Sequence, residues 1–335
     1  MSAASNRPLG LHLTLAAHAP ASSGDLARNA EDHGYRSAWL AEAGGSDAIV
    51  SLSAFAAKTS RIELATGVVP IQIRTPTVMA TAFLTLNEIS GGRAVAGLGV
   101  SSPIIVERWH GASYAKPVTA MRECVTIMRQ IFKDGRAKFA GEIFKSDFRL
   151  GFRPTQPAPK IYLAALNPPM LRLAGEIGDG VLFNYSPPEA VGAMIDEVKA
   201  GADRAGRKLA DIDLAIYIRM CVTPDERVAL DTFKRELAGY SFVESYGQMF
   251  ARYGLADEFA EVRRLWKEGH RDEAPGAISD ASARKLAAFG SPEAGRDLIA
   301  RFRAAGITLP VVFPVGPPKT ADRDFAATMT AMAGA

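Results

Sequence analysis

Hydrophobic and polar residues alternate along this chain with two different periods, which predict strands and helices in turn. Short runs of apolar and β-branched residues, bounded by turn residues, are typical of strands that are buried on both faces of a parallel sheet. Eight such runs lie at residues 9–16, 37–42, 63–69, 94–100, 161–165, 181–184, 213–222 and 309–313. Segments with apolar residues three and four positions apart predict helices between these strands. At residues 117–132, for example, Val118, Met121 and Val125 share one helical face.

Prolines and glycines mark where the predicted helices begin and end. Segment 75–89 has Pro76 in its first turn and a Ser-Gly-Gly sequence directly after its end, a usual way to start and stop a helix. The two glycines of that sequence are therefore interpreted as turn residues. Gly67 and Gly99 instead fall at or near the carboxyl ends of two predicted strands, where missing side chains leave backbone N–H groups open to a ligand.

Two segments interrupt the alternation of strands and helices. Aromatic residues alternate with polar ones at 139–150, which predicts an antiparallel hairpin inserted after the fourth barrel helix. Residues 224–289 contain several helical pieces after the seventh strand and are too long for one barrel helix. We expect them to cover a barrel edge, form a lid or make a subunit contact.

Eight strands in alternation with helices predict an α/β fold, namely one (β/α)8 TIM barrel with these two insertions. We interpret residues 1–335 as a single domain, since one barrel of about 250 residues plus insertions accounts for the length. A doubly wound sheet is the alternative. It usually needs fewer strands, and its glycine-rich fingerprint should follow the first strand, where this chain has Ala16-Ala17-His18.

The composition narrows the function classes. Lys and Arg number 39 against 36 Asp and Glu, so the net charge of +3 is small and gives no reason to expect nucleic acid as a partner. Cys124 and Cys221 are the only cysteines and are interpreted as buried thiols, not as a disulfide or a metal site. With no run of eighteen apolar residues and no recognisable signal peptide, the sequence predicts a soluble cytoplasmic protein that does not enter a membrane.

Several motifs are shared with a known family. They are W-L-A-E at 39–42, A-T-G-V-V-P at 65–70, R-T-P-T at 74–77, S-G-G-R-A-V-A-G-L-G-V-S at 90–101, E-R-W-H-G at 107–111 and I-Y-L-A-A-L-N-P at 161–168. Together they make nearly the whole chain resemble the bacterial luciferase-like monooxygenase superfamily, in particular its branch of oxidoreductases that use the deazaflavin coenzyme F420. The resemblance implies a barrel that holds a flavin or deazaflavin ring at the carboxyl ends of its strands, usually as a homodimer.

The resemblance also points to cofactor-binding residues. The predicted set is Gly67, Val68, Gly99, Ser101, Ala164, Ala165, Leu166 and Asn167. Gly67 and Val68 match the place where deazaflavin-dependent members have a non-prolyl cis peptide against the back face of the ring. Residues 164–167 match the loop that offers backbone N–H groups to the cofactor phosphate, before a helix whose positive N-terminus would face that phosphate. The alternatives are an ordinary glycine at a strand end and a plain connection, and Ser101 can instead cap the helix after it.

The sequence departs from one branch of the family at the end of the second strand. The sugar-phosphate dehydrogenases of the family have an Asp-His pair there, in which the His acts as the base. This chain has Glu42 and Ala43 at that place. Because alanine cannot move a proton, sugar-phosphate dehydrogenation by that route is not expected.

Three residues are candidates for moving a proton. Glu42 ends the second strand, so its carboxylate should enter the pocket and serve as acid or base, or else hydrogen-bond the ring or nearby backbone. His18 follows the first strand and His110 follows the fourth, both on the face where the active sites of barrels lie. A structural or surface role is the alternative for each histidine. Trp109, next to His110, can roof the pocket or pack on the barrel rim.

The expected cofactor determines the expected reaction. Our first hypothesis is an oxidoreductase that transfers a hydride between coenzyme F420 and a small organic substrate. The alternative is an FMN-dependent luciferase-like monooxygenase that uses reduced flavin and oxygen. A deazaflavin has carbon at ring position five and cannot form the stable peroxide adduct that oxygen insertion requires, so cofactor identity decides the reaction type. A second alternative is a protein that binds flavin or deazaflavin without turnover.

Overall fold

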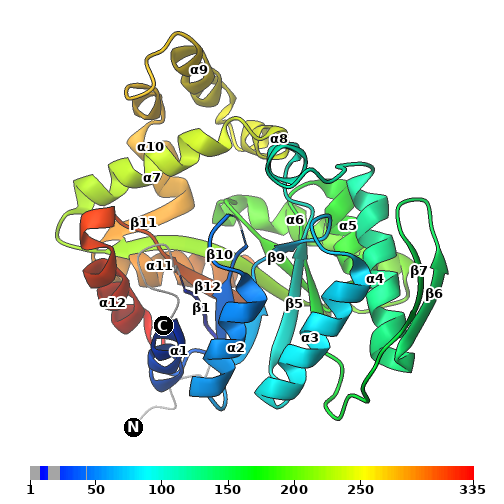
Figure 1. Cartoon of the computed structure of the whole chain (residues 1–335). Coiled ribbons are helices and arrows are strands. Elements are labelled where there is room, and N and C mark those ends of the chain that lie inside the picture. The colour runs from blue at the N-terminus through cyan, green and yellow to red at the C-terminus, as the bar shows by residue number, and fades with distance from the viewer. Residues whose placement is uncertain (1–7, 14–22, 43) are drawn as a thin grey trace.

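Eight parallel strands close into a barrel, as the sequence predicts (Figure 1). The computed structural model describes residues 8–13, 23–42 and 44–335. The barrel strands are β1 (Gly10–His12), β2 (Ser37–Leu40), β3 (Glu63–Thr66), β5 (Ala94–Gly99), β8 (Lys160–Ala164), β9 (Gly180–Phe183), β10 (Asp213–Val222) and β12 (Leu309–Pro314). They neighbour one another in this order, and parallel pairing of β12 with β1 closes the ring.

Helices cover the outside of the barrel. They are α1 (Ser23–Asp32), α2 (Ala48–Lys58), α3 (Pro76–Ser90), α4 (Pro117–Asp134), α5 (Pro168–Ile177), α6 (Pro188–Arg204), α11 (Pro292–Ala304) and α12 (Ala321–Met332). Asp47 caps α2, because it accepts a hydrogen bond from the N–H of Val50 at 2.9 Å. Gly91, in the predicted Ser-Gly-Gly turn, ends α3 with a φ of 69°. Among the helices of the described residues, none has both the length and the apolar character needed to cross a membrane.

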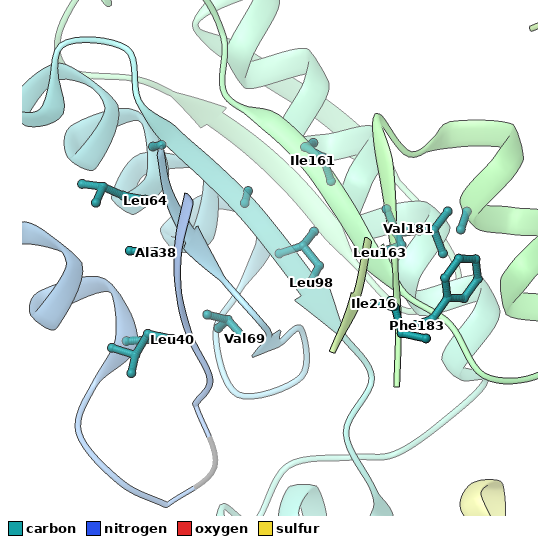
Figure 2. Packing of buried hydrophobic residues seen from close by; sticks show 14 of the residues in the cluster. Ala38, Leu40, Leu64, Val69, Leu98, Ile161, Leu163, Val181, Phe183 and Ile216 are labelled. Atoms are coloured by element: carbon teal, nitrogen blue, oxygen red, sulfur yellow. The ribbon is translucent and has the colours of Figure 1, made fainter. Parts of the chain in front are cut away.

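Side chains of the barrel strands point alternately outward and inward, which separates two hydrophobic clusters. Figure 2 shows outward-facing residues that pack against the surrounding helices, including Ala38, Leu40, Leu64, Val69, Leu98, Ile161, Leu163, Val181, Phe183 and Ile216. A second cluster fills the barrel interior: Trp39, Ala65, Val95, Tyr162, Leu182, Ala215, Tyr217, Leu309 and Val311. Because the interior is packed with side chains, a ligand has room only at the mouth of the barrel.

The predicted hairpin after the fourth barrel helix is confirmed. Strands β6 (Arg136–Ala140) and β7 (Lys145–Arg149) pair antiparallel beside α4 (Figure 1). Glu123 of α4 holds the turn, because its carboxylate accepts hydrogen bonds from the N–H groups of Glu142, Ile143 and Phe144 at 2.7 to 2.9 Å. Burial raises the pKa of Glu123, but these three donors outweigh it and lower the pKa below its ordinary value.

The second insertion is helical, with one strand that the sequence did not predict. Its helices are α7 (Glu226–Tyr240), α8 (Glu244–Arg252), α9 (Ala256–Lys267) and α10 (Asp280–Leu286), and it rises above the barrel mouth (Figure 1). The predicted helical pieces are present over residues 224–289, and the strand that was not predicted is β11 (Ala287–Gly290). This short strand pairs with the last four residues of β10. Its four residues lie directly after a helix, so no alternation marks them in the sequence.

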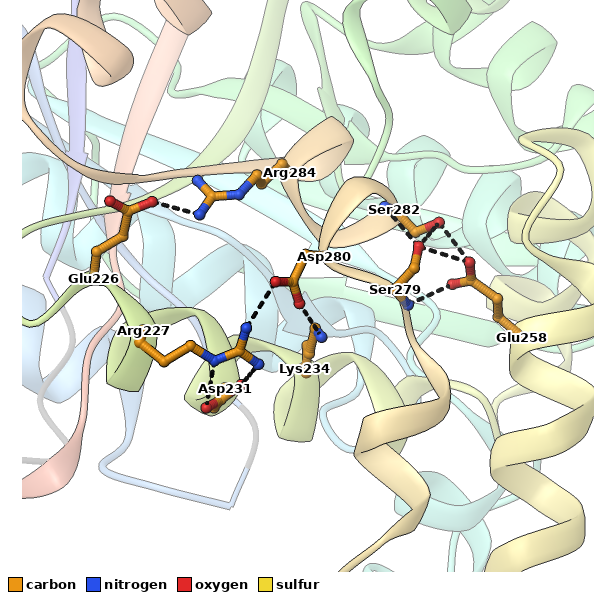
Figure 3. A network of polar contacts seen from close by, with 9 residues as sticks. All are labelled: Glu226, Arg227, Asp231, Lys234, Glu258, Ser279, Asp280, Ser282 and Arg284. Carbon is orange, nitrogen blue, oxygen red and sulfur yellow. Dashed lines mark hydrogen bonds and ion pairs between the residues drawn. The ribbon is translucent and has the colours of Figure 1, made fainter.

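A polar network ties the helices of this insertion together (Figure 3). Asp280 of α10 accepts from Arg227 at 2.7 Å and also pairs with Lys234, whose side chain is only 7% exposed. Glu258 of α9 accepts from the hydroxyls of Ser279 and Ser282 at 2.8 and 2.9 Å. These contacts join α7, α9 and α10, so we expect them to move as one unit.

Glu31 joins α1 to the start of β3 and gives a prediction about stability. Its carboxylate is buried, with the residue 4% exposed, and accepts from the N–H groups of Ser60, Arg61 and Ile62 at 2.6 to 2.9 Å. We expect Glu31→Gln to lower the free energy of unfolding by about 2 kcal/mol at pH 7, because hydrogen bonds to a charged acceptor are lost. Urea unfolding monitored by circular dichroism measures this loss.

The pH dependence of that loss follows from the pKa of Glu31. Burial raises this pKa, but the three backbone donors outweigh burial and lower it from 4.5 to about 2. The stabilisation is therefore complete above about pH 4.5 and disappears as the pH falls toward 2. The difference between wild type and Glu31→Gln should shrink over this window. Asp32→Asn is the matched control, since Asp32 is exposed and its partner among the described residues is Arg28, one turn away. Equal losses in both variants would contradict the assignment.

Candidate active site

The strand that follows α2 is broken at the barrel mouth. The predicted strand 63–69 is two strands, β3 and β4 (Val69–Pro70), and the peptide between Gly67 and Val68 is cis, as the resemblance implies. The Thr66 hydroxyl donates to the carbonyl oxygen of Gly97 at 2.7 Å and accepts from the Gly97 N–H at 2.9 Å. The hydroxyl thus takes the place of the main-chain hydrogen bonds between neighbouring strands where the main chain leaves the sheet. Beyond the break, β4 pairs again with the end of β5.

Tyr217 holds the Gly67 side of this break. It points inward from β10, lies 5% exposed, and donates its hydroxyl to the carbonyl oxygen of Gly67 at 2.8 Å. Burial raises the pKa of Tyr217 well above its ordinary value, so the hydroxyl keeps its proton. A Cβ on Gly67 would lie 2.7 Å from Cζ of Tyr217 and closer still to its hydroxyl oxygen, so only glycine fits at this position.

Three of the predicted cofactor residues meet on the other side of the break. A Cβ on Gly99 would overlap Cγ2 of Val68 and would lie 3.9 Å from Cβ of Ala164. Val68 and Ala164 are half-buried, so they form a small apolar platform at the mouth. The missing side chain of Gly99 makes room for Val68. Ser101, just after β5, has a φ of 55°, a left-handed conformation that is uncommon outside glycine and often found at functional sites.

Glu42 lies two residues after the end of β2 and has two partners within the protein. Its carboxylate forms an ion pair with Arg74 and accepts from the N–H of Ala48 at 3.0 Å, at the start of α2. Arg74 also pairs with Asp47. Both oxygens of Glu42 are therefore used within the protein. The ion pair fixes the connections after β2 and β4 relative to each other.

The two candidate histidines are not brought together with Glu42 by any described contact. His18 lies outside the described residues. His110 is exposed at the end of a π-helical turn, η3 (Ile104–Trp109). Trp109 of this turn lies against the connection after β2, because a Cβ on Gly44 would be 3.0 Å from its ring. It therefore stands at the rim of the mouth and is 59% exposed.

The predicted phosphate loop after β8 offers fewer backbone donors than expected. The N–H of Ala165 donates to Leu182 at 3.2 Å, and α5 begins with two prolines, which have no N–H. The N–H groups of the next two residues both donate to the carbonyl oxygen of Asn167. Arg252 of α8 supplies a positive charge instead, because its guanidinium donates to the Leu166 carbonyl and the Asn167 side chain at 3.1 and 2.8 Å. Sequence reasoning missed Arg252.

A buried arginine organises the opposite side of the mouth. Arg219 points inward from β10 with a 3% exposed side chain, donates to Asn184 at 2.6 Å and pairs with Glu236 of α7 at 2.9 Å. Its guanidinium lies 3.5 Å from the ring centre of Tyr185, the residue after Asn184, which has a φ of 50°. Burial lowers the pKa of Arg219, but the neighbouring Tyr185 and Glu236 raise it above its ordinary value. Asn184 also donates to the Tyr246 hydroxyl at 2.8 Å.

His12 of β1 completes the inner wall. It is 4% exposed, and its ring stacks on Phe313 with centroids 3.8 Å apart and meets the Tyr217 ring edge-on at 5.2 Å. Burial and the positive charge of Arg219 lower the pKa of His12 to about 3, so the imidazole is neutral at pH 7. A signal for this wall was present in the sequence. Alternate residues of a strand face the same side, and His12, Tyr217, Arg219 and Phe313 occupy the positions of β1, β10 and β12 that face the barrel interior.

Comparison with known proteins agrees with this architecture. The family described as luciferase-like monooxygenase matches residues 5–309. The chain belongs to this family.

Within the described residues, no group of three or more His, Cys, Asp or Glu side chains is placed to hold a metal ion. Cys124 and Cys221 are both buried and unbridged, and burial raises the pKa of the Cys124 thiol to about 12.

Relatives within and around the family share nearly the full length of the chain. A putative coenzyme F420-dependent oxidoreductase of Mycobacterium tuberculosis is 32% identical over 91% of this chain and 94% of its own. A 5,10-methylenetetrahydromethanopterin reductase of Archaeoglobus fulgidus is 33% identical over 87% of this chain and 89% of its own. The solved structure of the coenzyme F420-dependent tetrahydromethanopterin reductase from Methanopyrus kandleri superposes with a TM-score of 0.82 at 24% identity, covering 98% of both chains.

Proposed function

We propose that this protein is an F420-dependent oxidoreductase that transfers a hydride between the coenzyme and a small organic substrate. The observation that carries the proposal is the apolar platform of Val68 and Ala164 at the barrel mouth, made possible by the two glycines beside Val68. A flat ring needs such a surface behind it, free of charged side chains. The names of the relatives that are 32% and 33% identical support the choice of F420 over FMN.

The residues at the mouth fit the coenzyme in the following way. Bound coenzyme F420 supplies a deazaflavin ring whose position five donates or accepts the hydride. Val68 supports the back face of that ring, and Tyr217 holds the Gly67 carbonyl so that Val68 keeps its place. Residues 166–167 and Arg252 bind the phosphate at the start of α5.

Glu42, His18 and His110 stay our candidates for proton transfer, and the structure favours a positioning role for Glu42. Both of its oxygens are engaged, one by Arg74 and the other by the Ala48 N–H. Glu42 thereby orients Arg74 at the mouth. The neutral imidazole of His12 does not carry a proton at pH 7, since its pKa is about 3.

Titration of the purified protein with coenzyme F420 and, separately, with FMN tests the proposal. We expect F420 fluorescence to report saturable binding at micromolar concentration, and FMN to bind much more weakly. Reduction of the bound F420 in the presence of a panel of secondary alcohols would then demonstrate hydride transfer. Binding of FMN without F420, or of neither ring at millimolar concentration, would overturn the proposal.

Arg252→Ala gives a prediction about the phosphate end. Because no carboxylate among the described residues pairs with Arg252, its charge is available to an anion. We expect the dissociation constant of F420 to rise roughly tenfold, about 1.4 kcal/mol. The phosphate-free deazariboflavin fragment should bind the variant and the wild type equally. Arg264→Ala on α9, which removes two exposed ion pairs, is the matched control. An equal loss for the fragment would show that Arg252 acts on the fold and not on the phosphate.

A homodimer is the expected assembly, carried over from the resemblance. Val50 of α2 and Val78 of α3 are 69% and 54% exposed on two neighbouring helices, which makes this face a candidate for the contact. Light scattering on the purified protein measures the oligomeric state, and a monomer at micromolar concentration would contradict this part of the proposal.

A further inference from the structure

A cavity opens at the carboxyl end of β12. Its volume is about 870 Å³, and its walls come from α7, from the chain after β12 and from the start of α12. In Figure 1 α7 runs above α12 on this side of the barrel. Small-molecule sites in proteins usually measure about 300–1,000 Å³, so the cavity is large enough for a bulky ligand.

Contacts between side chains connect this cavity to the proposed ring site. Phe313 forms part of its wall, stacks on His12 and lies edge-on to Tyr217 at 5.2 Å, and Tyr217 donates to the Gly67 carbonyl. On the α7 side, Glu236 lines the cavity and pairs with Arg219. One side chain of the cavity wall, Phe313, therefore contacts Tyr217, which holds the main chain next to Val68.

The lining is mainly apolar along its length. Phe313, Pro314, Val315 and Phe325 supply rings and aliphatic groups. Two of the four charged side chains in the lining are paired as follows: Glu236 bonds to Arg219 and Tyr185, and Arg323 bonds to Asp225 and Asp324. The other two, Lys319 and Asp322, are exposed. Such a cavity favours burial of an uncharged hydrocarbon group.

We propose that this cavity is the substrate site and that it takes a substrate with a bulky, largely apolar body. This inference rests on the proposed function, because the reacting carbon must reach the ring above Val68 while the apolar body occupies the space between α7 and α12. A substrate as small as acetone leaves most of the cavity unused. Affinity should therefore increase with the size of the apolar group.

A series of straight-chain 2-alkanones, from acetone to 2-nonanone, tests the proposal on the complex of the protein with F420. A ketone is the simplest hydride acceptor, and F420 fluorescence follows its binding. We expect affinity to increase roughly threefold to fourfold for each added methylene until the cavity is filled. A series that is flat in the wild-type complex would overturn the inference. Failure of F420 itself to bind would instead sink the proposed function.

Two substitutions that fill the cavity from opposite walls make the test specific. Thr232→Trp acts from α7 and Ala321→Trp from α12, and both residues line the cavity. We expect each variant to bind F420 like the wild type and to lose the dependence on chain length beyond the first few carbons. Val228→Trp is the matched control, because Val228 lies one turn before Thr232 on α7, is 51% exposed and is not part of the lining. A chain-length dependence equal in all three variants would overturn the inference, and either filling variant suffices if the other does not fold.

Discussion

Gly67→Ala is expected to weaken binding of coenzyme F420 by about 100-fold or more, which corresponds to about 2.7 kcal/mol. The added methyl group has no room, because it would lie 2.7 Å from Cζ of Tyr217 and 3.0 Å from Cε3 of Trp39. Both rings are buried inside the barrel. Relief requires Tyr217 to give up its hydrogen bond to the Gly67 carbonyl, or the main chain carrying Val68 to move. Fluorescence titration measures the affinity, and urea unfolding measures any loss of stability.

Two further variants separate this steric cause from a general effect of alanine. Gly45→Ala is the matched control, since its added Cβ would meet nothing within 4 Å. In a Tyr217→Leu background the hydroxyl is gone, so the same Gly67→Ala change should cost clearly less affinity. An affinity of Gly67→Ala within threefold of the wild type would refute the platform as we describe it.

Arg219→Met should lower the free energy of unfolding by about 3 kcal/mol. The substitution keeps an apolar side chain of similar length but leaves Asn184 and Glu236 without their partner at a buried site. This loss of stability is smaller than the largest losses expected when a buried ion pair is broken, because the Glu236 side chain is 32% exposed and can be hydrated. Arg219→Lys should recover part of the stability, since the charge remains but the two-sided hydrogen bonding does not.

The measurement is urea unfolding, with Arg28→Met as the matched control. Arg28 is exposed on α1 and pairs with Asp32 one turn away, so its loss should cost less than about 0.5 kcal/mol. The network also joins α7 to the barrel, so we expect proteolysis within residues 226–286 to become faster in Arg219→Met. A stability equal to that of Arg28→Met would mean that Arg219 does not hold the insertion.

The barrel could be predicted from the sequence because its signals are local. Each barrel strand is a short buried run with its own turn residues, and caps such as Asp47 lie within three residues of the N–H that they bind. The Gly67–Val68 cis peptide was found through the resemblance, and no local pattern marks it. The strand β11 was missed because four residues after a helix do not show a period.

The polar part of the site could not be predicted in the same way. Tyr217 and Gly67 are 150 residues apart, and Arg252 is 85 residues from Asn167. The sequence around one residue of such a pair therefore contains no pattern that predicts its partner. The pairing of Glu42 with Arg74, 32 residues further along the chain, was not predicted. Side-chain partners of this kind follow from the closed barrel and its insertion, which the sequence specifies only through the whole fold.

Strand β10 pairs with β9 along its first residues and with β11 along its last, which has a consequence for any attempt to shorten this protein. The first residues of β10 pair with β9, and its last four pair with β11, which belongs to the helical insertion. Deleting the insertion would therefore uncover a row of main-chain donors and acceptors along residues 219–222. Such an exposed edge invites other chains to add to the sheet. A shortened enzyme should then aggregate even though all eight barrel strands are still present.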